Sequence, residues 1–175
     1  KFEVAKSVFM DGLQKVLNVV SLRSTLPILS NVLINATKSS LTLATTDLEV
    51  SVRCAIDAKV QKPGASTIPA RRLSSIIREL PDSAIQIESD DKDNATVTCG
   101  SSFFKIVGLS KDEFPPMPKA EGKHSYTMDQ AAFREMLRKI SYAASTDETR
   151  YVLNGVLLSF KGGKLIMVAT DGRRL

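Results

Sequence analysis

The feature that most constrains the fold of this chain is a segment that occurs twice, 124 positions apart. The apolar run Val32–Leu33–Ile34 aligns without a gap with Val156–Leu157–Leu158, and Thr46–Asp47 aligns with Thr170–Asp171. A match that keeps its register across a helical period, a loop and two strands predicts one supersecondary unit used twice. Accidental similarity between two apolar segments is the alternative. The same spacing pairs further positions upstream: Phe9 with Phe133, Leu13 with Leu137, Lys15 with Lys139, and Val16 with Ile140.

The length of 175 residues and this period imply one complete domain and part of a second. We place the boundary at Phe114–Pro118, because a segment this rich in proline cannot enter the interior of a sheet. The domains expected are therefore 1–118 and a truncated 119–175. An alternating strand is expected to follow Asp47, whereas only Gly172–Leu175 follows Asp171, so we expect the chain to be part of a longer protein.

Hydrophobic periodicity predicts an α+β fold in which the first domain contains the order β-α-β-β-β twice. The first unit is expected as a strand at 2–4, a helix whose buried face runs from Phe9 to Val20, and strands at 28–36, 41–45 and 48–60. The second unit is expected as a strand at 66–68, a helix at 70–80, and strands at 84–88, 95–99 and 103–107.

Composition narrows the class of protein only moderately. The net charge of +5 and the isoelectric point near 9.3 allow a polyanionic partner without requiring one. No apolar run approaches the roughly 18 residues needed to cross a bilayer, and the first residues lack the apolar core of a signal peptide. We therefore expect a cytoplasmic protein with no membrane partner. Cys54 and Cys99 lie in separate strand patterns, which favours buried reduced thiols over a disulfide or a metal site.

The residue patterns that would indicate catalysis are missing from the sequence. The one histidine, His124, falls in the connector, so neither a Ser-His-Asp arrangement nor a histidine metal site can be assembled. Gly162–Gly163–Lys164 lacks the first glycine and the hydroxyl residue of a phosphate loop and is expected to be a hairpin turn. Asp47 and Asp171 occupy equivalent positions, which favours a turn-capping role for both. The sequence predicts no catalytic residue, no metal site and no cofactor.

Cations gather on two helices, opposite the expected core side. Arg71 and Arg78 lie opposite the apolar stripe of the helix at 70–80, and Arg134 and Arg138 are placed similarly on a helix that Asp129 should cap. Such residues often do no more than keep a solvated surface polar. Two helices from different domains with the same pattern favour a surface that binds phosphate backbones, where charge supplies affinity without reading bases.

Six motifs follow one another along the chain: Thr25–Asn31, Thr46–Glu49, Ile68–Arg71, Phe114–Pro115, Arg150–Gly155 and Ala169–Leu175. In this order they resemble those of the bacterial sliding clamp, the beta subunit of DNA polymerase III. The resemblance implies a DNA clamp fold, with helices on one face of antiparallel sheets, three domains per subunit and a homodimeric ring. It implies a non-catalytic processivity factor that encircles duplex DNA of any sequence and tethers the replicative polymerase. The third domain would be absent from this chain.

The resemblance also implies roles for particular residues. The DNA-facing cations would be Arg23, Arg71, Arg78, Arg134 and Arg138. Phe104, on the last strand of the first domain, would pack across the junction between subunits, and Arg72 would lie nearer that junction. The polymerase, the clamp loader and other proteins with clamp-binding peptides would dock in an apolar pocket. Its residues here would be Leu153, Thr170, Gly172, Arg173, Arg174 and Leu175.

Two departures from the family pattern limit what can be carried over. Asp147–Glu148 is more acidic than the DNA-contacting loop of some relatives, so no DNA contact is assigned there, and Arg173 stands where histidine is frequent. Two other functions remain open: a DNA-binding platform of an enzyme whose catalytic part lies outside this chain, and a repeat-built interaction scaffold unconnected with nucleic acid. A third copy of the repeat beyond Leu175 would discriminate a clamp from the first of these.

Overall fold

The computed structural model describes residues 1–20, 25–38, 40–117 and 124–174. The chain folds into two compact units, Lys1–Lys119 and Ala120–Leu175. No helix among the described residues is long and apolar enough to cross a membrane.

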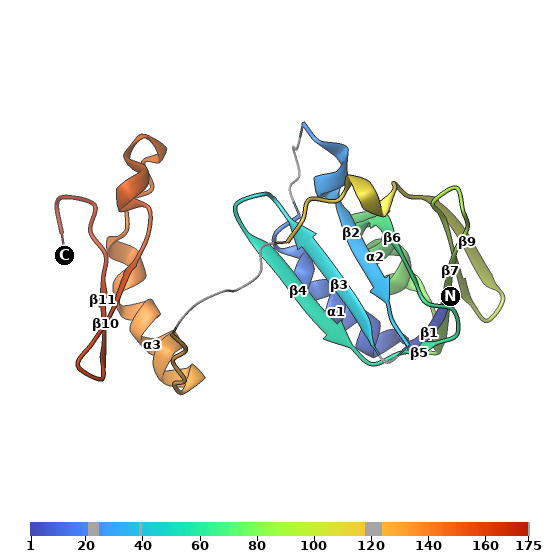
Figure 1. Ribbon diagram of the computed structural model, residues 1–175, viewed down its shortest axis with the longest axis horizontal. Coiled ribbons are helices and arrows are strands. Elements are labelled where there is room, and N and C mark those ends of the chain that lie inside the picture. The colour runs from blue at the N-terminus through green and yellow to red at the C-terminus, as the bar shows by residue number, and fades with distance from the viewer. Residues whose placement is uncertain (21–24, 39, 118–123, 175) are drawn as a thin grey trace. The chain divides into compact units, whose positions relative to one another are not determined.

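The first unit contains two antiparallel sheets and two helices (Figure 1). The four-stranded sheet has the order β4-β3-β2-β6, and the five-stranded sheet has the order β5-β1-β7-β8-β9. The strands of the first sheet are β2 (Asn31–Ala36), β3 (Leu41–Thr46), β4 (Ser51–Ile56) and β6 (Gly64–Pro69). Those of the second are β1 (Phe2–Ala5), β5 (Lys59–Val60), β7 (Ala84–Ser89), β8 (Asn94–Cys99) and β9 (Ser102–Val107).

Both helices of this unit are amphipathic and bury their apolar sides. Helix α1 (Lys6–Leu17) packs on β3 and β4, and α2 (Ala70–Glu79) packs on β2 and β6, so the pair covers one face of the four-stranded sheet (Figure 1). Phe9 and Leu13 of α1 and Ile77 of α2 are fully buried in one cluster with side chains from both sheets. This confirms the predicted α+β order and the predicted helix at 70–80, which ends one residue earlier.

Gly12 allows α1 to approach the sheet closely. A Cβ atom at this position would lie 2.8 Å from Ile56 Cγ2 and 3.2 Å from Leu43 Cδ1, and both distances are shorter than ordinary van der Waals contact. Glycine in the middle of a helix costs about 1 kcal/mol relative to alanine. The fold accepts that cost because the helix axis could not otherwise come this near the sheet.

Two of the predicted strands begin later than expected. Pro27–Ser30 forms a 3₁₀ turn, so the strand predicted at 28–36 is confined to β2, which starts at Asn31. The strand predicted at 48–60 was wrong at its start, because residues 47–50 form a turn in which Leu48 has φ of 81°. It was also wrong as a single strand, because β4 ends at Ile56 and β5 belongs to the other sheet. The side chains of Thr46 and Asp47 bond to backbone N–H groups of this turn and so prevent the chain from staying extended.

The connector that begins at Phe114 belongs to the first unit up to Met117. Phe114 is buried against Ile28 and Leu29, and Met117 packs on the same small cluster. Cys99 is a buried free thiol, whereas Cys54 is also free but only partly buried, unlike the prediction for both.

The second unit consists of one helix, two strands and short 3₁₀ turns (Figure 1). Helix α3 (Gln130–Ile140) is followed by turns at Ser141–Ala143 and Glu148–Leu153 and by the hairpin β10 (Leu157–Lys161) and β11 (Lys164–Val168). The side chain of Asp129 accepts a hydrogen bond from the backbone N–H of Ala132 at 2.8 Å, which confirms the predicted cap. Gly162 and Gly163 have φ of 58° and 71° and form the predicted hairpin turn.

The strand register confirms the repeat of 124 positions. In the first unit Leu33 pairs with Ala44, and in the second unit the equivalent Leu157 pairs with Val168. The predicted core stripe of α3, however, is only half-buried, whereas its counterparts Phe9, Leu13 and Val16 are fully buried. The reason is that the described part of the second unit contains no counterpart of β4, β6 or the five-stranded sheet.

Candidate functional site

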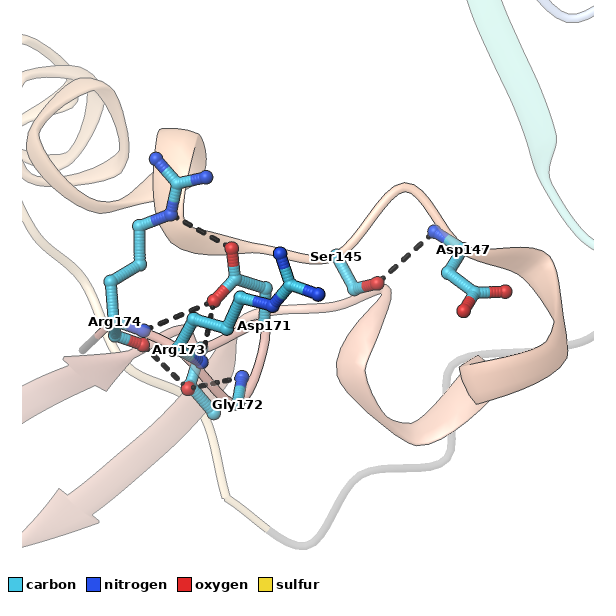
Figure 2. A network of polar contacts seen from close by, with 7 residues as sticks. Ser145, Asp147, Asp171, Gly172, Arg173 and Arg174 are labelled. Carbon is cyan, nitrogen blue, oxygen red and sulfur yellow. Dashed lines mark hydrogen bonds and ion pairs between the residues drawn. The ribbon is translucent and has the colours of Figure 1, made fainter.

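The turn that ends the hairpin β10–β11 is held by two neighbouring side chains (Figure 2). Oδ1 of Asp171 accepts hydrogen bonds from the backbone N–H groups of Arg173 at 2.9 Å and Arg174 at 3.1 Å. The hydroxyl of Thr170 accepts from the backbone N–H of Gly172 at 3.0 Å and donates to the carbonyl of Arg174 at 2.6 Å. Gly172 has φ of 84°, in the left-handed region that favours glycine.

The same turn occurs in the first unit with the same bonds. Oδ1 of Asp47 accepts from the backbone N–H groups of Glu49 at 3.0 Å and Val50 at 2.7 Å. The hydroxyl of Thr46 accepts from the N–H of Leu48 at 3.0 Å and donates to the carbonyl of Val50 at 3.1 Å. The predicted turn-capping role of the two aspartates is therefore confirmed.

Asp171 has an additional partner that its counterpart in the first unit does not share. The guanidinium Nε of Arg174 donates to Asp171 Oδ2 at 2.8 Å (Figure 2). This bond and the two backbone N–H groups lower the pKa of Asp171 from 3.8 to about 2. Val50 occupies the position equivalent to Arg174 in the first unit and cannot form this ion pair. The ion pair is therefore an addition to a turn that forms without it.

The loop that contains Leu153 lies against this turn. Leu153 is half-buried, and its carbonyl accepts a hydrogen bond from the backbone N–H of Ser145 at 2.9 Å. A Cβ atom on Gly172 would lie 3.8 Å from Nη1 of Arg150, which brings the loop and the turn together. The structure thus places the predicted pocket residues Leu153, Thr170, Gly172, Arg173 and Arg174 in one region of the second unit. Leu175 lies outside the described residues.

Two side chains beside this region were assigned no role from the sequence, although Arg150 begins one of the six motifs. Arg150 lies next to Gly172 and is 3.6 Å from Asp147 through its Nε atom. Tyr142, in the turn Ser141–Ala143, is 65% exposed and lies near Arg174. Neither shows a periodic signal, because both come from loops whose path only the folded chain defines.

Asp147 has a structural task within the same loop. Its carboxylate accepts hydrogen bonds from the hydroxyl of Thr149 at 2.6 Å and from the backbone N–H of Thr149 at 3.0 Å. The hydrogen bond from the Thr149 hydroxyl is the main cause that lowers the pKa of Asp147. The backbone N–H of Asp147 donates to Ser145 Oγ at 3.0 Å (Figure 2). Because this carboxylate is ionised and committed to the turn, it offers no favourable contact to a phosphate.

An apolar cavity of about 430 Å³ occurs elsewhere in the second unit. Tyr126, Phe133 and Phe160 contribute to its walls, and the rings of Tyr126 and Phe160 stack with centroids 4.1 Å apart. The repeat equates Tyr126 and Phe133 with Phe2 and Phe9, which are core residues of the first unit. This cavity is therefore an open flank of the core and not a candidate binding site.

The predicted DNA-facing arginines are exposed wherever the structure describes them. Arg71 and Arg78 project from α2, and Arg134 and Arg138 project from α3. Arg72, predicted to lie nearer the subunit junction, is also exposed on α2. Arg138 forms two hydrogen bonds with the carboxylate of Glu135, at 2.9 Å and 3.1 Å, and this contact is the main cause that lowers the pKa of Glu135. Arg23 lies outside the described residues.

The strand predicted to carry the subunit junction is an edge strand. β9 is the outermost strand of the five-stranded sheet and pairs only with β8, with Phe104 opposite Val97. Phe103 is 65% exposed and Phe104 is 38% exposed. An exposed edge with aromatic side chains is suited to pairing with another chain.

Comparison with known proteins places the whole chain in one family. The family described as DNA polymerase III beta subunit, N-terminal domain, matches residues 1–118, and the corresponding central domain matches residues 127–175. The chain belongs to the DNA polymerase III beta-subunit family. The predicted resemblance is confirmed, and so is the clamp-type α+β fold.

Relatives of this beta-subunit chain are named sliding clamps. The chain is 39% identical to the beta sliding clamp of Chlamydia muridarum over 175 residues, which is 100% of this chain and 48% of that protein. It is 39% identical to the Synechocystis beta sliding clamp over 178 residues, covering 97% of this chain and 46% of that protein. The chain thus spans about half the length of the curated relatives it matches.

Solved structures of beta subunits agree with the fold. The Pseudomonas aeruginosa DNA polymerase III subunit beta superposes with a TM-score of 0.93 at 35% identity, over 98% of this chain and 47% of that one. The DNA polymerase sliding clamp of Bacillus subtilis superposes with a TM-score of 0.93 at 28% identity, over 97% of this chain and 47% of that one.

Proposed function

We propose that the full-length protein is a DNA sliding clamp, a non-catalytic processivity factor that encircles duplex DNA and tethers the replicative polymerase. The observation that carries this proposal is the repeated unit. The same hairpin register and the same capped turn occur in two units, and these units match the N-terminal and central domains of one family. We assign clamp domain one to 1–118 and the first part of clamp domain two to 119–175. A homodimeric ring in the bacterial cytoplasm follows from this proposal.

The DNA-facing surface is assigned to Arg23, Arg71, Arg78, Arg134 and Arg138. Support comes from the exposed positions of the four described arginines, which lie on the helices and not on the sheets. Contacts of this kind neutralise phosphates and release counterions, so binding weakens as salt rises and does not depend on sequence. Glu135 holds Arg138, which makes Arg134 the stronger candidate on α3.

The subunit junction is assigned to Phe104 and, nearer its margin, Arg72. The exposed edge of β9 supports this assignment, because an unpaired edge is a hazard unless another strand covers it. Phe104→Arg in the full-length protein should convert a dimer to a monomer in light scattering, whereas Phe2→Tyr should leave it dimeric. A dimer that survives Phe104→Arg would place the junction elsewhere.

The partner pocket is assigned to Leu153, Thr170, Gly172, Arg173, Arg174 and Leu175, and its partners are the polymerase, the clamp loader and other proteins with clamp-binding peptides. The proximity of the loop and the turn supports it, and arginine stems can flank an apolar groove. Clamps of Bartonella birtlesii and Pseudomonas aeruginosa have been solved bound to griselimycin, which supplies a probe. Leu153→Ala should weaken binding of griselimycin and of a labelled clamp-binding peptide. The control is Leu48→Ala, in the turn of the first unit that is equivalent to Thr170–Arg174.

Retention on circular DNA tests the function as a whole. Full-length protein loaded by a clamp loader should remain on a nicked circle in salt that removes ordinary DNA-binding proteins, and it should leave after the circle is linearised. Such a result requires a closed ring, because charge alone holds a protein equally on both forms. Equal retention on circular and linear DNA would refute the clamp and favour a DNA-binding platform.

A further inference from the structure

Both helices of the first unit begin in a way that should destabilise them. Helix α1 has Lys6 as its first residue, and α2 has Arg71 in its first turn. Neither helix has an acidic residue in that turn or a side chain that caps it. The N-terminus of a helix carries a partial positive charge, so a cation there is unfavourable unless something compensates.

The compensation comes from the other helix. The ammonium of Lys6 donates to the backbone carbonyl of Arg78 at 2.9 Å and to that of Leu80, the residue that follows α2. In the opposite direction, Nη2 of Arg71 donates to the carbonyl of Val20, beyond the end of α1, at 3.4 Å. The helices are antiparallel neighbours, and each one's N-terminal cation reaches carbonyl groups at or just beyond the other's C-terminal end.

The two contacts differ in strength. Lys6 is half-buried and reaches two carbonyls that α2 itself leaves without partners, and a cation at a helix C-terminus also interacts favourably with the helix dipole. The bond from Arg71 is long and its side chain is exposed. Lys6 is therefore the main restraint, and it acts on the last turn of α2, where helices otherwise fray.

We propose that Lys6 is a positioning residue for Arg78, an inference that rests on the proposed DNA-binding function. Its ammonium holds the carbonyl of Arg78 itself and so fixes the backbone from which that guanidinium projects. Two of the three ammonium donors of Lys6 are committed to backbone oxygens, so its role is to hold the chain and not to bind phosphate. The assignment is specific to the first unit, because the equivalent of Lys6 in α3 is Gln130 and that helix is capped by Asp129.

A double-mutant cycle in the full-length protein separates this role from a direct DNA contact. Lys6→Met keeps the length of the side chain and removes its charge, and it should weaken the affinity for linear duplex DNA at low salt about threefold, the size typical of a charge at a helix end. Arg78→Ala should weaken this affinity as well, and adding Lys6→Met to it should cause no further loss. Lys6→Arg, which can reach both carbonyls, should restore the affinity. Lys59→Met is the control that removes a charge on strand β5 and not on a helix.

The possible outcomes are distinct. Additive losses of affinity in the double variant would show that Lys6 binds DNA directly, and an unchanged affinity of Lys6→Met would show that the contact does not position Arg78; either result overturns the proposal. The proposal would also be overturned if Lys6→Met lowered the thermal stability and its effect on DNA binding did not depend on Arg78. If Lys6→Met does not fold, Lys6→Gln replaces it in the cycle, because glutamine keeps a donor without the charge. Failure of the unsubstituted protein to remain on circles would refute the clamp function instead.

Discussion

Replacing Gly12 with alanine tests whether the close approach of α1 to the sheet is a requirement of the fold. The new Cβ atom would lie 2.8 Å from Ile56 Cγ2 and 3.2 Å from Leu43 Cδ1. Overpacking of this kind costs about 1–3 kcal/mol, whereas alanine improves helix propensity by about 1 kcal/mol. We therefore expect Gly12→Ala to lower the free energy of unfolding by about 1 kcal/mol, the difference between these opposing contributions.

Urea denaturation followed by circular dichroism measures this change. Leu43 is fully buried and cannot move, so Ile56, which is only partly buried, must yield. Ile56→Leu removes the methyl group nearest the new atom while keeping the volume, and it should recover most of the loss when combined with Gly12→Ala. If Gly12→Ala alone were as stable as the unsubstituted chain, the clash would be too small to matter, and the glycine would need another explanation.

Three further results are expected. Thr45→Val should lower the free energy of unfolding in urea by about 1–2 kcal/mol, because the fully buried hydroxyl donates to the carbonyl of Val16 at 2.7 Å; no loss would mean that water satisfies that carbonyl. Gly172→Ala should cost about 1 kcal/mol at φ of 84° and should speed amide exchange in the turn, and unchanged exchange would contradict the strain. The lowered pKa of Asp171 means that its contribution to stability is complete above the ordinary value of 3.8 and is lost as the pH falls through about 2. The carboxyl carbon of Asp171 should titrate near pH 2 by NMR, and Arg174→Ala, which removes the guanidinium, should raise the pKa of Asp171. Titration near 3.8 in the unsubstituted protein would exclude the ion pair with Arg174.

Much of the fold was predictable from the sequence because the repeat fixes several elements at once. Val32–Leu33–Ile34 and its copy could be placed in equivalent strands, and the structure gives both hairpins one register. The capping role of Asp47 followed from its equivalence to Asp171, since a group that recurs at the same place in two copies has a structural task. Periodicity also located α2 within one residue, whereas α1 ends at Leu17, three residues before the predicted Val20.

The errors arose where local side-chain bonds override periodicity. Leu48 alternates correctly for a strand, yet the hydroxyl of Thr46 and the carboxylate of Asp47 take the backbone N–H groups that a strand would use. The two hydrogen bonds that Lys6 donates could not be predicted from the sequence, because their acceptors are backbone carbonyls more than seventy positions away. Backbone carbonyls have no sequence signature. Only the folded structure therefore shows which lysines bind backbone carbonyls of the protein and which are free to bind DNA.

Gly12 also affects whether the two copies of the repeated unit can exchange their helices during folding. The position equivalent to Gly12 in α3 is Met136, so a helix with the sequence of α3 could not settle onto β3 and β4, where even one extra methyl group is crowded. Exchange of equivalent elements is a characteristic misfolding route of repeat proteins. We therefore expect the mismatch at this residue to disfavour packing of α3 on the hairpin of the first unit. A chimera in which 130–140 replaces 6–16 should misfold, and Met136→Gly within that chimera should improve its folding.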